Sequence, residues 1–336
     1  MKFSILGAGS WGTAFAKLLV ENGHEVLIWA RREELADKIN KYHANDDYLP
    51  NVRLPETLIA SSDISSAVHF SDNLVIAVPT KYVDETMAKI ERKPAVIVNL
   101  SKGIDEKLRT ISSIVKSRWR DADYLVLSGP CHAVEVAKRL PTSVVIAGPN
   151  SITEAFQQAF SNDYFRVYVN DDVLGVEISG AVKNVIAIAA GILDGLGQWH
   201  NAKAALITRG LQEIARFGLS LGARSPLTFM GLAGMGDLIV TCTSPYSRNR
   251  YVGEMIGKGM ALKDILSQMK MVAEGVYTVG PLLRMADSLH IDMPICRQVY
   301  DVLFRKKDPY QAISELMSRP LKMEIDLTQI GPESDL

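Results

Sequence analysis

The residue of this sequence best suited to chemistry is Lys183. It stands in the run Ile-Ser-Gly-Ala-Val-Lys-Asn-Val-Ile-Ala-Ile of residues 178–188, where its neighbours at helical spacing are small or apolar. A lysine in the middle of a buried helix cannot easily extend to water, and burial lowers the pKa of its ammonium group toward neutrality. Such a lysine can give a proton to a carbonyl or take one from an alcohol. The alternative is a lysine that pairs with a structural carboxylate.

A glycine-rich turn near the N-terminus predicts a dinucleotide site. Gly7, Gly9 and Gly12 form a G-x-G-x-x-G pattern between a short apolar strand and a helix, which is the context that such a site requires. Gly7 permits the tight turn, Gly9 lets the backbone approach a pyrophosphate, and Gly12 lets the helix pack closely on the strand. The pyrophosphate would meet free N–H groups at the positive end of the helix. The alternative is a plain strand-to-helix turn.

The end of the second strand bears on the choice of cofactor. An NAD site usually has an acid there, bonded to the ribose hydroxyl. This sequence has Arg31 and Arg32 instead, followed by Glu33 and Glu34. An arginine can pair with a 2′-phosphate and stack on adenine, so the pattern favours NADP(H). The two glutamates keep NADH open, and a solvated helix start is the alternative interpretation.

Two further strand ends carry polar residues. Lys102 follows the strand at 95–100, and the Ser-Gly-Pro-Cys-His-Ala run of residues 128–133 follows the strand at 124–127. Ligands of open α/β sheets bind beyond the carboxyl ends of strands, so Lys102 can face a ligand there, and the N–H groups of Cys131 and Ala133 can face an anion. A surface lysine and a small packed cysteine are the alternatives.

A possible phosphate clamp lies in the second half of the chain. A glycine-dense segment at 231–237, expected to be a loop, ends in Asp237, and Ser247, Arg248 and Asn249 follow shortly after it. Arginine matches phosphate geometry with two hydrogen bonds. Spacing alone favours a polar surface loop.

The elements that must position these residues differ between the two halves of the chain. Apolar strand-like runs at 3–6, 25–30, 74–78, 95–100, 124–127 and 143–147 alternate with helical patterns such as 11–21 and 32–42, which indicates a doubly wound, Rossmann-type α/β sheet. Beyond residue 170 strand patterns nearly vanish, and 173–196 predicts one long buried helix. We therefore expect a dinucleotide-binding domain at 1–170 and a mostly α-helical substrate and catalytic domain at 171–336, with a polar tail from Gly331.

Composition narrows the function class. Of 336 residues 47% are hydrophobic, and the formal net charge is −1, which argues against nucleic-acid binding driven by overall charge. Three scattered cysteines without a CxxC pair suggest neither a disulfide framework nor a zinc site. The start of the chain has no signal-peptide pattern, and the most apolar stretch, at 185–193, is too short to span a membrane. We expect a soluble, cytoplasmic protein without a metal.

Together the motifs resemble a known family, the bacterial NAD(P)-dependent sn-glycerol-3-phosphate dehydrogenases. The resemblance runs from Lys2 to about Leu321 and rests on GAGSWGTAFA, NLSKG, SGPCHAVEVA, GAVKNVIAIAAGILDG, NAKAALITRG, TFMGLAGMGDLIVTCTSPYSRNR and VAEGVYTV. It implies reduction of dihydroxyacetone phosphate to sn-glycerol 3-phosphate with NADPH or NADH, a role in glycerophospholipid synthesis, and a homodimer.

The resemblance also implies individual roles. Lys183 would be the catalytic acid and base. The cofactor would be bound by the three glycines and by Ser10, Trp11, Arg31, Arg32, Lys102, Ala133, Arg248, Val272 and Glu274. The substrate would be bound by Lys102, Gly129, Cys131, Lys183, Asp237, Ser247, Arg248 and Asn249. Cys131 departs from the family, whose members commonly have serine or threonine there, and a thiol is a weaker hydrogen-bond donor.

Two other functions stay open at this point. A β-hydroxyacid dehydrogenase of the 6-phosphogluconate or hydroxyisobutyrate type also combines a dinucleotide domain with a helix lysine, but the Arg248–Asn249 pair favours a small phosphorylated substrate. A non-catalytic NADPH sensor would be expected to lack the buried lysine, and Lys183 is present.

Overall fold

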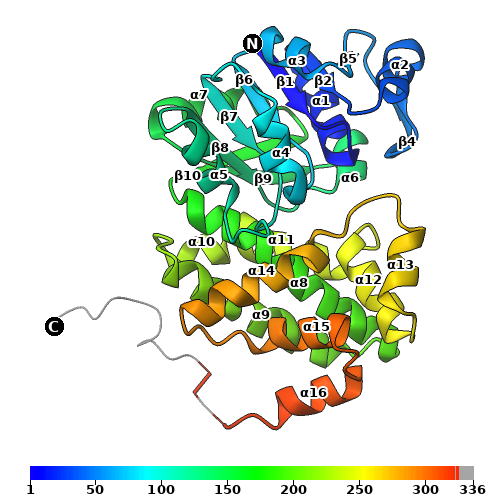
Figure 1. Ribbon diagram of the computed structural model, residues 1–336, viewed down its shortest axis with the longest axis vertical. Coiled ribbons are helices and arrows are strands. Elements are labelled where there is room, and N and C mark those ends of the chain that lie inside the picture. The colour runs from blue at the N-terminus through cyan, green and yellow to red at the C-terminus, as the bar shows by residue number, and fades with distance from the viewer. Residues whose placement is uncertain (322, 325–336) are drawn as a thin grey trace, which may run out of the picture. The chain divides into compact units, whose positions relative to one another are not determined.

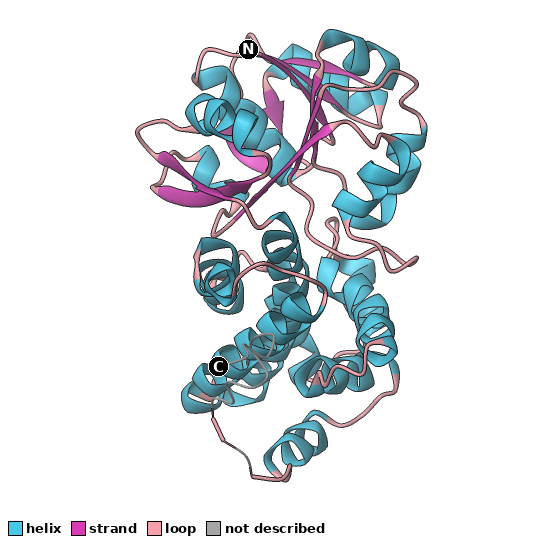
Figure 2. Ribbon diagram, turned by 90° about the vertical axis from the view of Figure 1, so that its left-hand side faces the viewer, coloured by secondary structure: helices cyan, strands magenta, loops and turns pink. Residues whose placement is uncertain are grey.

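The computed structural model describes residues 1–321, 323 and 324, so the polar tail predicted from Gly331 lies outside the described residues. The chain divides into two compact units. Unit 1 comprises residues 1–102 and 109–173, and unit 2 comprises residues 103–108 and the chain from 174 onward. Figure 2 shows the sheet strands in the first unit and helices with loops in the second. The boundary between independently folding domains at 170/171 stays a prediction.

Unit 1 is built on an eight-stranded sheet in the order β10-β9-β8-β7-β6-β1-β2-β5 (Figure 1). Its strands are β1 Lys2–Leu6, β2 Glu25–Trp29, β5 Ile59–Ser61, β6 Asn73–Ile76, β7 Val96–Asn99, β8 Asp123–Ser128, β9 Thr142–Ala147 and β10 Phe165–Asn170. Every pair from β5 to β8 is parallel, which confirms the predicted Rossmann-type fold class. The sheet is not wholly parallel, however, because β9 runs antiparallel to β8 and takes β10 with it.

The helices of unit 1 cover this sheet and share its apolar core. They are α1 Ser10–Glu21, α2 Glu33–Tyr42, α3 Ile64–Phe70, α4 Val83–Ala88, α5 Ile111–Arg118, α6 Ala133–Ala137 and α7 Asn150–Phe160. A short antiparallel pair, β3 Ala44–Asn45 and β4 Leu49–Arg53, follows α2. Phe3 of β1, Phe15 of α1 and Phe160 of α7 are fully buried, and the Phe160 ring contacts the rings of both Phe3 and Phe15. This aromatic cluster fixes α1, and with it the glycine turn, against β1.

Unit 2 packs its helices around one central helix. The helices are α8 Val173–Gly197, α9 His200–Ser220, α10 Pro226–Met230, α11 Asp237–Thr243, α12 Arg248–Gly257, α13 Leu262–Gln268, α14 Glu274–Ser288, α15 Pro294–Phe304 and α16 Pro309–Met317. α8 is the long buried helix that the sequence predicts. It and the segment from Pro226 to Thr243 are long and apolar enough to cross a membrane, but the most apolar window of α8 is 94% buried inside the protein. α8 is therefore the core helix of this unit.

The glycine-dense segment at 231–237 is not the loop that the sequence predicts. Residues Leu232–Gly236 wind into a π-helical turn that continues directly into α11. A Cβ atom on Gly234 would lie 1.9 Å from the carbonyl oxygen of Phe229. Glycine is needed here for tight winding against the preceding turn rather than for an open loop, and this winding places Asp237 at the start of α11.

Backbone contact between α8 and α12 fixes a second part of the site. Gly191 and Gly195 of α8 face Gly253 and Gly257 of α12, and a Cβ atom on Gly253 would lie 1.9 Å from the carbonyl oxygen of Ile188. Only glycines allow the helices to come this close. The first turn of α12 is thereby held in register with the helix that carries Lys183.

Candidate active site

The glycine turn of unit 1 has the geometry that a dinucleotide needs. Gly7 has φ +120°, a region that side chains rarely adopt, and a Cβ atom on Gly12 would lie 2.0 Å from the carbonyl oxygen of Gly7. A Cβ atom on Gly9 would meet nothing within 4 Å, so the space beside it is open. No side chain caps the N-terminus of α1. Open space beside the first turn of a helix that no side chain caps suits a pyrophosphate, and these residues fit a nicotinamide dinucleotide.

The next two residues flank this turn. The Ser10 hydroxyl donates to the carbonyl oxygen of Tyr48 at 2.6 Å. Trp11 packs its ring against Phe15, with centroids 5.7 Å apart. Within the described part of the chain, its buried indole nitrogen Nε1 has no hydrogen-bond partner. A buried donor without a partner is unusual, and this one belongs to a residue two positions after Gly9, where the space is open.

The two arginines after β2 have different surroundings. Arg32 forms an ion pair with Asp47 at 2.7 Å and lies over the Tyr48 ring. Arg31 is exposed and lies over the Tyr82 ring, with its guanidinium carbon 5.8 Å from the ring centroid. The Arg31 guanidinium is thus better placed than that of Arg32 to bind a phosphate. Its neighbour Tyr82 was not identified from the sequence.

Lys102, Gly129 and Cys131 come together in unit 1, beyond the ends of β7 and β8. The Lys102 ammonium donates to the carbonyl oxygen of Gly129 at 3.2 Å and lies 3.8 Å from the Cys131 sulfur. The Cys131 thiol donates to the same carbonyl oxygen at 3.1 Å. Ala133 begins α6 two residues later. The structure therefore brings three residues predicted to bind substrate into one cluster.

Lys183 lies in a buried polar cluster of unit 2. Only 6% of its surface is exposed, and its Nζ atom is 2.5 Å from Asp237 Oδ1 and 2.7 Å from Thr241 Oγ1. Thr241 in turn donates to the carbonyl oxygen of Asp237 at 2.6 Å. An adjacent carboxylate stabilises the ammonium form of a lysine. Sequence reasoning missed Thr241, which lies one helical turn after Asp237 and was hidden in an apolar run.

The thiol next to this cluster is not a nucleophile. Burial raises the pKa of Cys242 to about 12, and the positive charge of Lys183 opposes this shift only in part. A thiol with so high a pKa stays protonated at neutral pH. Among the described residues no group of three or more His, Cys, Asp or Glu side chains is arranged to hold a metal ion.

The start of α12 carries the predicted phosphate clamp. Ser247 caps the helix, its hydroxyl accepting from the Arg250 N–H at 3.2 Å, and Arg248 is the first helical residue. Asn249 is buried and links three helices. Its amide nitrogen donates to Asn184 Oδ1 of α8 at 2.9 Å, and its oxygen accepts from the Gly275 N–H of α14 at 2.9 Å.

These contacts fix the start of α12. Glu274 begins α14, Val272 precedes it by two residues, and the next residue, Gly275, donates its N–H to Asn249. Asn249 therefore ties the helix of Lys183, the helix of Arg248 and the segment of Glu274 to one another. Sequence spacing gave no sign of this role.

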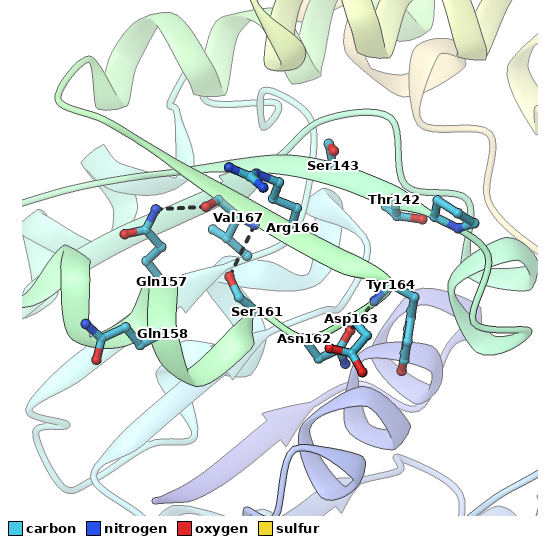
Figure 3. Close-up of a pocket in the computed structure, with 11 residues that line it drawn as sticks. Thr142, Ser143, Gln157, Gln158, Ser161, Asn162, Asp163, Tyr164, Arg166 and Val167 are labelled. Carbon is cyan, nitrogen blue, oxygen red and sulfur yellow. Dashed lines mark hydrogen bonds between the residues drawn. The ribbon is translucent and has the colours of Figure 1, made fainter.

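A separate hollow in unit 1 contains none of the predicted site residues. It is lined by residues of α7, of the loop at 161–164 and of the first parts of β9 and β10. The Gln157 amide donates to the Val167 carbonyl oxygen, and the Val167 N–H donates to the Ser161 hydroxyl (Figure 3). These bonds tie α7 to the outermost strand of the sheet.

Comparison with known proteins decides the family. Residues 2–153 match the model of the NAD-dependent glycerol-3-phosphate dehydrogenase N-terminus, and residues 172–314 match that of its C-terminus. The chain belongs to the NAD-dependent glycerol-3-phosphate dehydrogenase family. It is therefore an oxidoreductase, and the family assignment favours glycerol-3-phosphate dehydrogenase over the β-hydroxyacid dehydrogenase alternative.

Individual members agree with this assignment. A glycerol-3-phosphate dehydrogenase [NAD(P)+] of Thermotoga sp. is 50% identical over 96% of this chain and 99% of its own. That of Lysinibacillus sphaericus is 49% identical over 97% of this chain and 98% of its own. The crystal structure of glycerol-3-phosphate dehydrogenase from Coxiella burnetii is 38% identical, covers 95% of this chain and 99% of its own, and superposes with a TM-score of 0.91. A D-mandelate dehydrogenase with 15% identity shares the fold alone.

Proposed function

We propose that this chain reduces dihydroxyacetone phosphate to sn-glycerol 3-phosphate, reversibly, with NADPH or NADH, and so supplies glycerophospholipid synthesis. The observation that carries the proposal is the buried cluster of Lys183, Asp237 and Thr241. It provides a charged proton donor, held in place, in a family of NAD(P)-dependent dehydrogenases. A bound reduced nicotinamide supplies the hydride that the carbonyl carbon takes up.

Lys183 completes the reduction. As the carbonyl carbon becomes tetrahedral, its oxygen gains negative charge, and the Lys183 ammonium stabilises that charge and then donates a proton to it. One hydride and one proton convert the ketone into the alcohol, and in the reverse direction Lys183 accepts the proton. Asp237 and Thr241 each accept a hydrogen bond from the ammonium and so limit its rotation.

Binding residues fix the substrate for this step. Arg248 would hold the phosphate with paired hydrogen bonds, and Ser247 and Asn249 hold the helix that presents it. Lys102, Gly129 and Cys131 would contact the rest of the substrate. The phosphate group does not react, so the free energy of binding it can serve to orient the carbonyl group.

The cofactor would be held mainly by unit 1. Gly7, Gly9 and Gly12 would cradle the pyrophosphate, and Arg31 would meet a 2′-phosphate. The remaining proposed contacts are Ser10, Trp11, Arg32, Lys102, Ala133, Arg248, Val272 and Glu274. We further propose that the protein is a soluble, cytoplasmic homodimer that needs neither a metal nor a nucleic acid.

The test is the rate of NADPH and NADH oxidation, followed by absorbance, with dihydroxyacetone phosphate as the substrate. Turnover with either cofactor is expected. Turnover in the oxidative direction on 6-phosphogluconate or hydroxyisobutyrate, with none on glycerol 3-phosphate, would reject the proposal. A folded protein that binds NADPH and turns over none of these substrates would be the non-catalytic sensor.

Lys183→Ala tests the assigned proton donor. We expect kcat to fall by about 10²- to 10⁴-fold, the usual contribution of a positioned general acid, while the affinity for NADPH, measured by protein fluorescence, stays near the parent value. A variant with near-normal kcat would remove Lys183 from this role.

A further inference from the structure

An apolar groove of about 540 Å³ lies in unit 2, among α8, α9, α15 and α16. Its walls include Leu206 of α9, Val302 of α15, and Ile313 and Leu316 of α16. None of the residues proposed to bind cofactor or substrate lines it. The groove is therefore separate from the proposed active site and needs its own explanation.

Apolar side chains at the groove are left open to solvent. Met317, the last residue of α16, is 81% exposed, and Leu321 is fully exposed, and both line the groove. Met323, shortly after them, is 76% exposed. Contiguous exposed apolar surface on a soluble protein marks a binding site.

The described chain ends at this groove. After α16 the chain passes Pro320 and Leu321, which line it. The carbonyl oxygen of Glu324 then accepts a hydrogen bond from the Arg209 guanidinium of α9 at 3.2 Å, and Arg209 also lines the groove. Glu324, the last described residue, therefore lies at the groove's rim.

The sequence that follows suits this surface. Residues 325–330 read Ile-Asp-Leu-Thr-Gln-Ile, with three aliphatic side chains in six residues, and Gly331 and Pro332 come next. Six extended residues reach about 20 Å, enough to run along a groove of this volume.

Charge is also complementary. The tail carries Glu324, Asp326, Glu333 and Asp335, whereas Arg209, Arg216 and Arg319 line the groove. Arg319 pairs with Asp292, and Arg216 donates to the carbonyl oxygen of the same residue. Within the described part of the chain Arg209 has no carboxylate partner at ion-pair distance, so Asp326 would meet an available positive charge.

We propose that residues 325–330 bind this groove within the same chain. Ile325, Leu327 and Ile330 would cover the apolar walls, and Asp326 would lie near Arg209. A segment tethered at the rim of its own binding site has an effective concentration in the millimolar range, which favours the chain's own tail over that of a second copy. This inference does not depend on the proposed enzymatic function.

Hydrogen exchange of the full-length chain, followed by mass spectrometry, tests the proposal. We expect amides of residues 325–330 to exchange at least about tenfold more slowly than those of residues 333–336, which serve as an internal reference. Exchange of both segments at the rate of an unstructured peptide would overturn the proposal.

A matched pair of variants locates the contact. Ala204 and Ala205 are neighbouring, exposed residues of α9, and only Ala205 lines the groove. We expect Ala205→Glu to abolish the protection of residues 325–330, because it places a negative charge against an acidic segment, and Ala204→Glu to retain it. Unchanged circular dichroism of both variants shows that they fold. Equal protection in the two variants would contradict the proposed location.

Protein concentration separates the chain's own tail from that of a second copy. Protection that is constant between micromolar and tens of nanomolar chain supports binding within one chain. Protection that disappears on dilution, together with a smaller sedimentation coefficient, would assign the groove to a second copy and overturn the proposal.

Discussion

Lys183 has one feature of each of the two interpretations that its sequence context allowed. It is buried as a proton-transferring lysine would be, and it also pairs with a carboxylate, that of Asp237. The pair is compatible with catalysis because a proton donor in carbonyl reduction must start charged. Composition and spacing could identify the lysine but not Thr241, since a threonine in an apolar helical run looks like a packing residue until its partners are known.

Thr241 is proposed to position Lys183, and Thr241→Val tests this. Valine keeps the volume but cannot accept the Lys183 hydrogen bond, so the ammonium gains rotational freedom. We expect kcat to fall about tenfold, the cost of one hydrogen bond of about 1.4 kcal/mol, with little change in KM for dihydroxyacetone phosphate. Thr241→Ser should restore kcat. A purely structural role would predict equal kcat in the parent and both variants after correction for folded protein.

Arg31→Glu tests whether Arg31 distinguishes NADPH from NADH by binding the 2′-phosphate on the adenosine ribose. The guanidinium lies over Tyr82 and is exposed, so its replacement by a carboxylate places negative charge where a 2′-phosphate would bind. We expect Kd for NADPH to rise by about tenfold or more, and Kd for NADH to change much less. Titration of both cofactors against protein fluorescence measures this. An equal effect on the two cofactors would mean that Arg31 does not contact the 2′-phosphate.

Helices and strands with strong periodic patterns were predictable. The buried helix expected at 173–196 is α8, and the expected strand at 25–30 is β2. Elements that depend on close packing of one backbone segment against another could not be predicted. The turn at Leu232–Gly236 and the α8–α12 contact depend on glycines that permit backbone packing, and a sequence pattern cannot distinguish such glycines from those of a loop. The reversal at β9 likewise leaves no signal in an apolar run.

Glu213 joins two helices of unit 2 and provides a test by pH. It lies on α9 with only 2% of its surface exposed, and its carboxylate accepts from the N–H groups of Ile295 and Cys296 at the start of α15, at 2.6 and 3.2 Å. Burial raises the pKa of Glu213 to about 7, a shift that these hydrogen bonds only partly oppose. The native protein therefore holds this proton more tightly than the unfolded chain does.

This shift makes Glu213 destabilising as the pH rises. The contribution of Glu213 to the free energy of unfolding is greatest below about pH 4.5. It decreases by about 3 kcal/mol as the pH rises from about 4.5 to about 7. Glu213→Gln cannot titrate, so the free energy of unfolding of the parent minus that of the variant should fall by this amount over the window. Urea unfolding at successive pH values measures it. Parallel pH profiles would show that Glu213 titrates alike in the native and unfolded states.

The whole chain forms two units with separate apolar cores, and part of this division is invisible to sequence. The short segment Gly103–Leu108 is inserted in unit 1 along the chain but belongs to unit 2, where Ile104 is buried in the core. The sequence predicted one boundary because composition changes once, near residue 170. A six-residue segment with one buried isoleucine is too short to change the local composition, so the sequence does not show that it belongs to unit 2.

Ligand linkage tests whether both units hold the dinucleotide, as proposed. Trp11, Trp29 and Trp119 lie in unit 1 and Trp199 in unit 2, so in a Trp199→Phe variant tryptophan fluorescence reports on unit 1 alone. The helical signal in circular dichroism comes from both units. NADP⁺ at a hundred times its Kd stabilises the state that binds it by about 2.7 kcal/mol.

If Arg248, Val272 and Glu274 of unit 2 share the cofactor with the glycine turn of unit 1, NADP⁺ must stabilise both units together. We therefore expect the urea midpoints from fluorescence and from circular dichroism to rise by the same amount, and Arg248→Ala to reduce both shifts. A rise of the fluorescence midpoint alone would mean that unit 1 binds the dinucleotide unaided. Unit 2 would then gain no stability from NADP⁺, which means that its residues make no net contribution to binding the dinucleotide. Arg248, Val272 and Glu274 would have to be reassigned to the substrate or to packing.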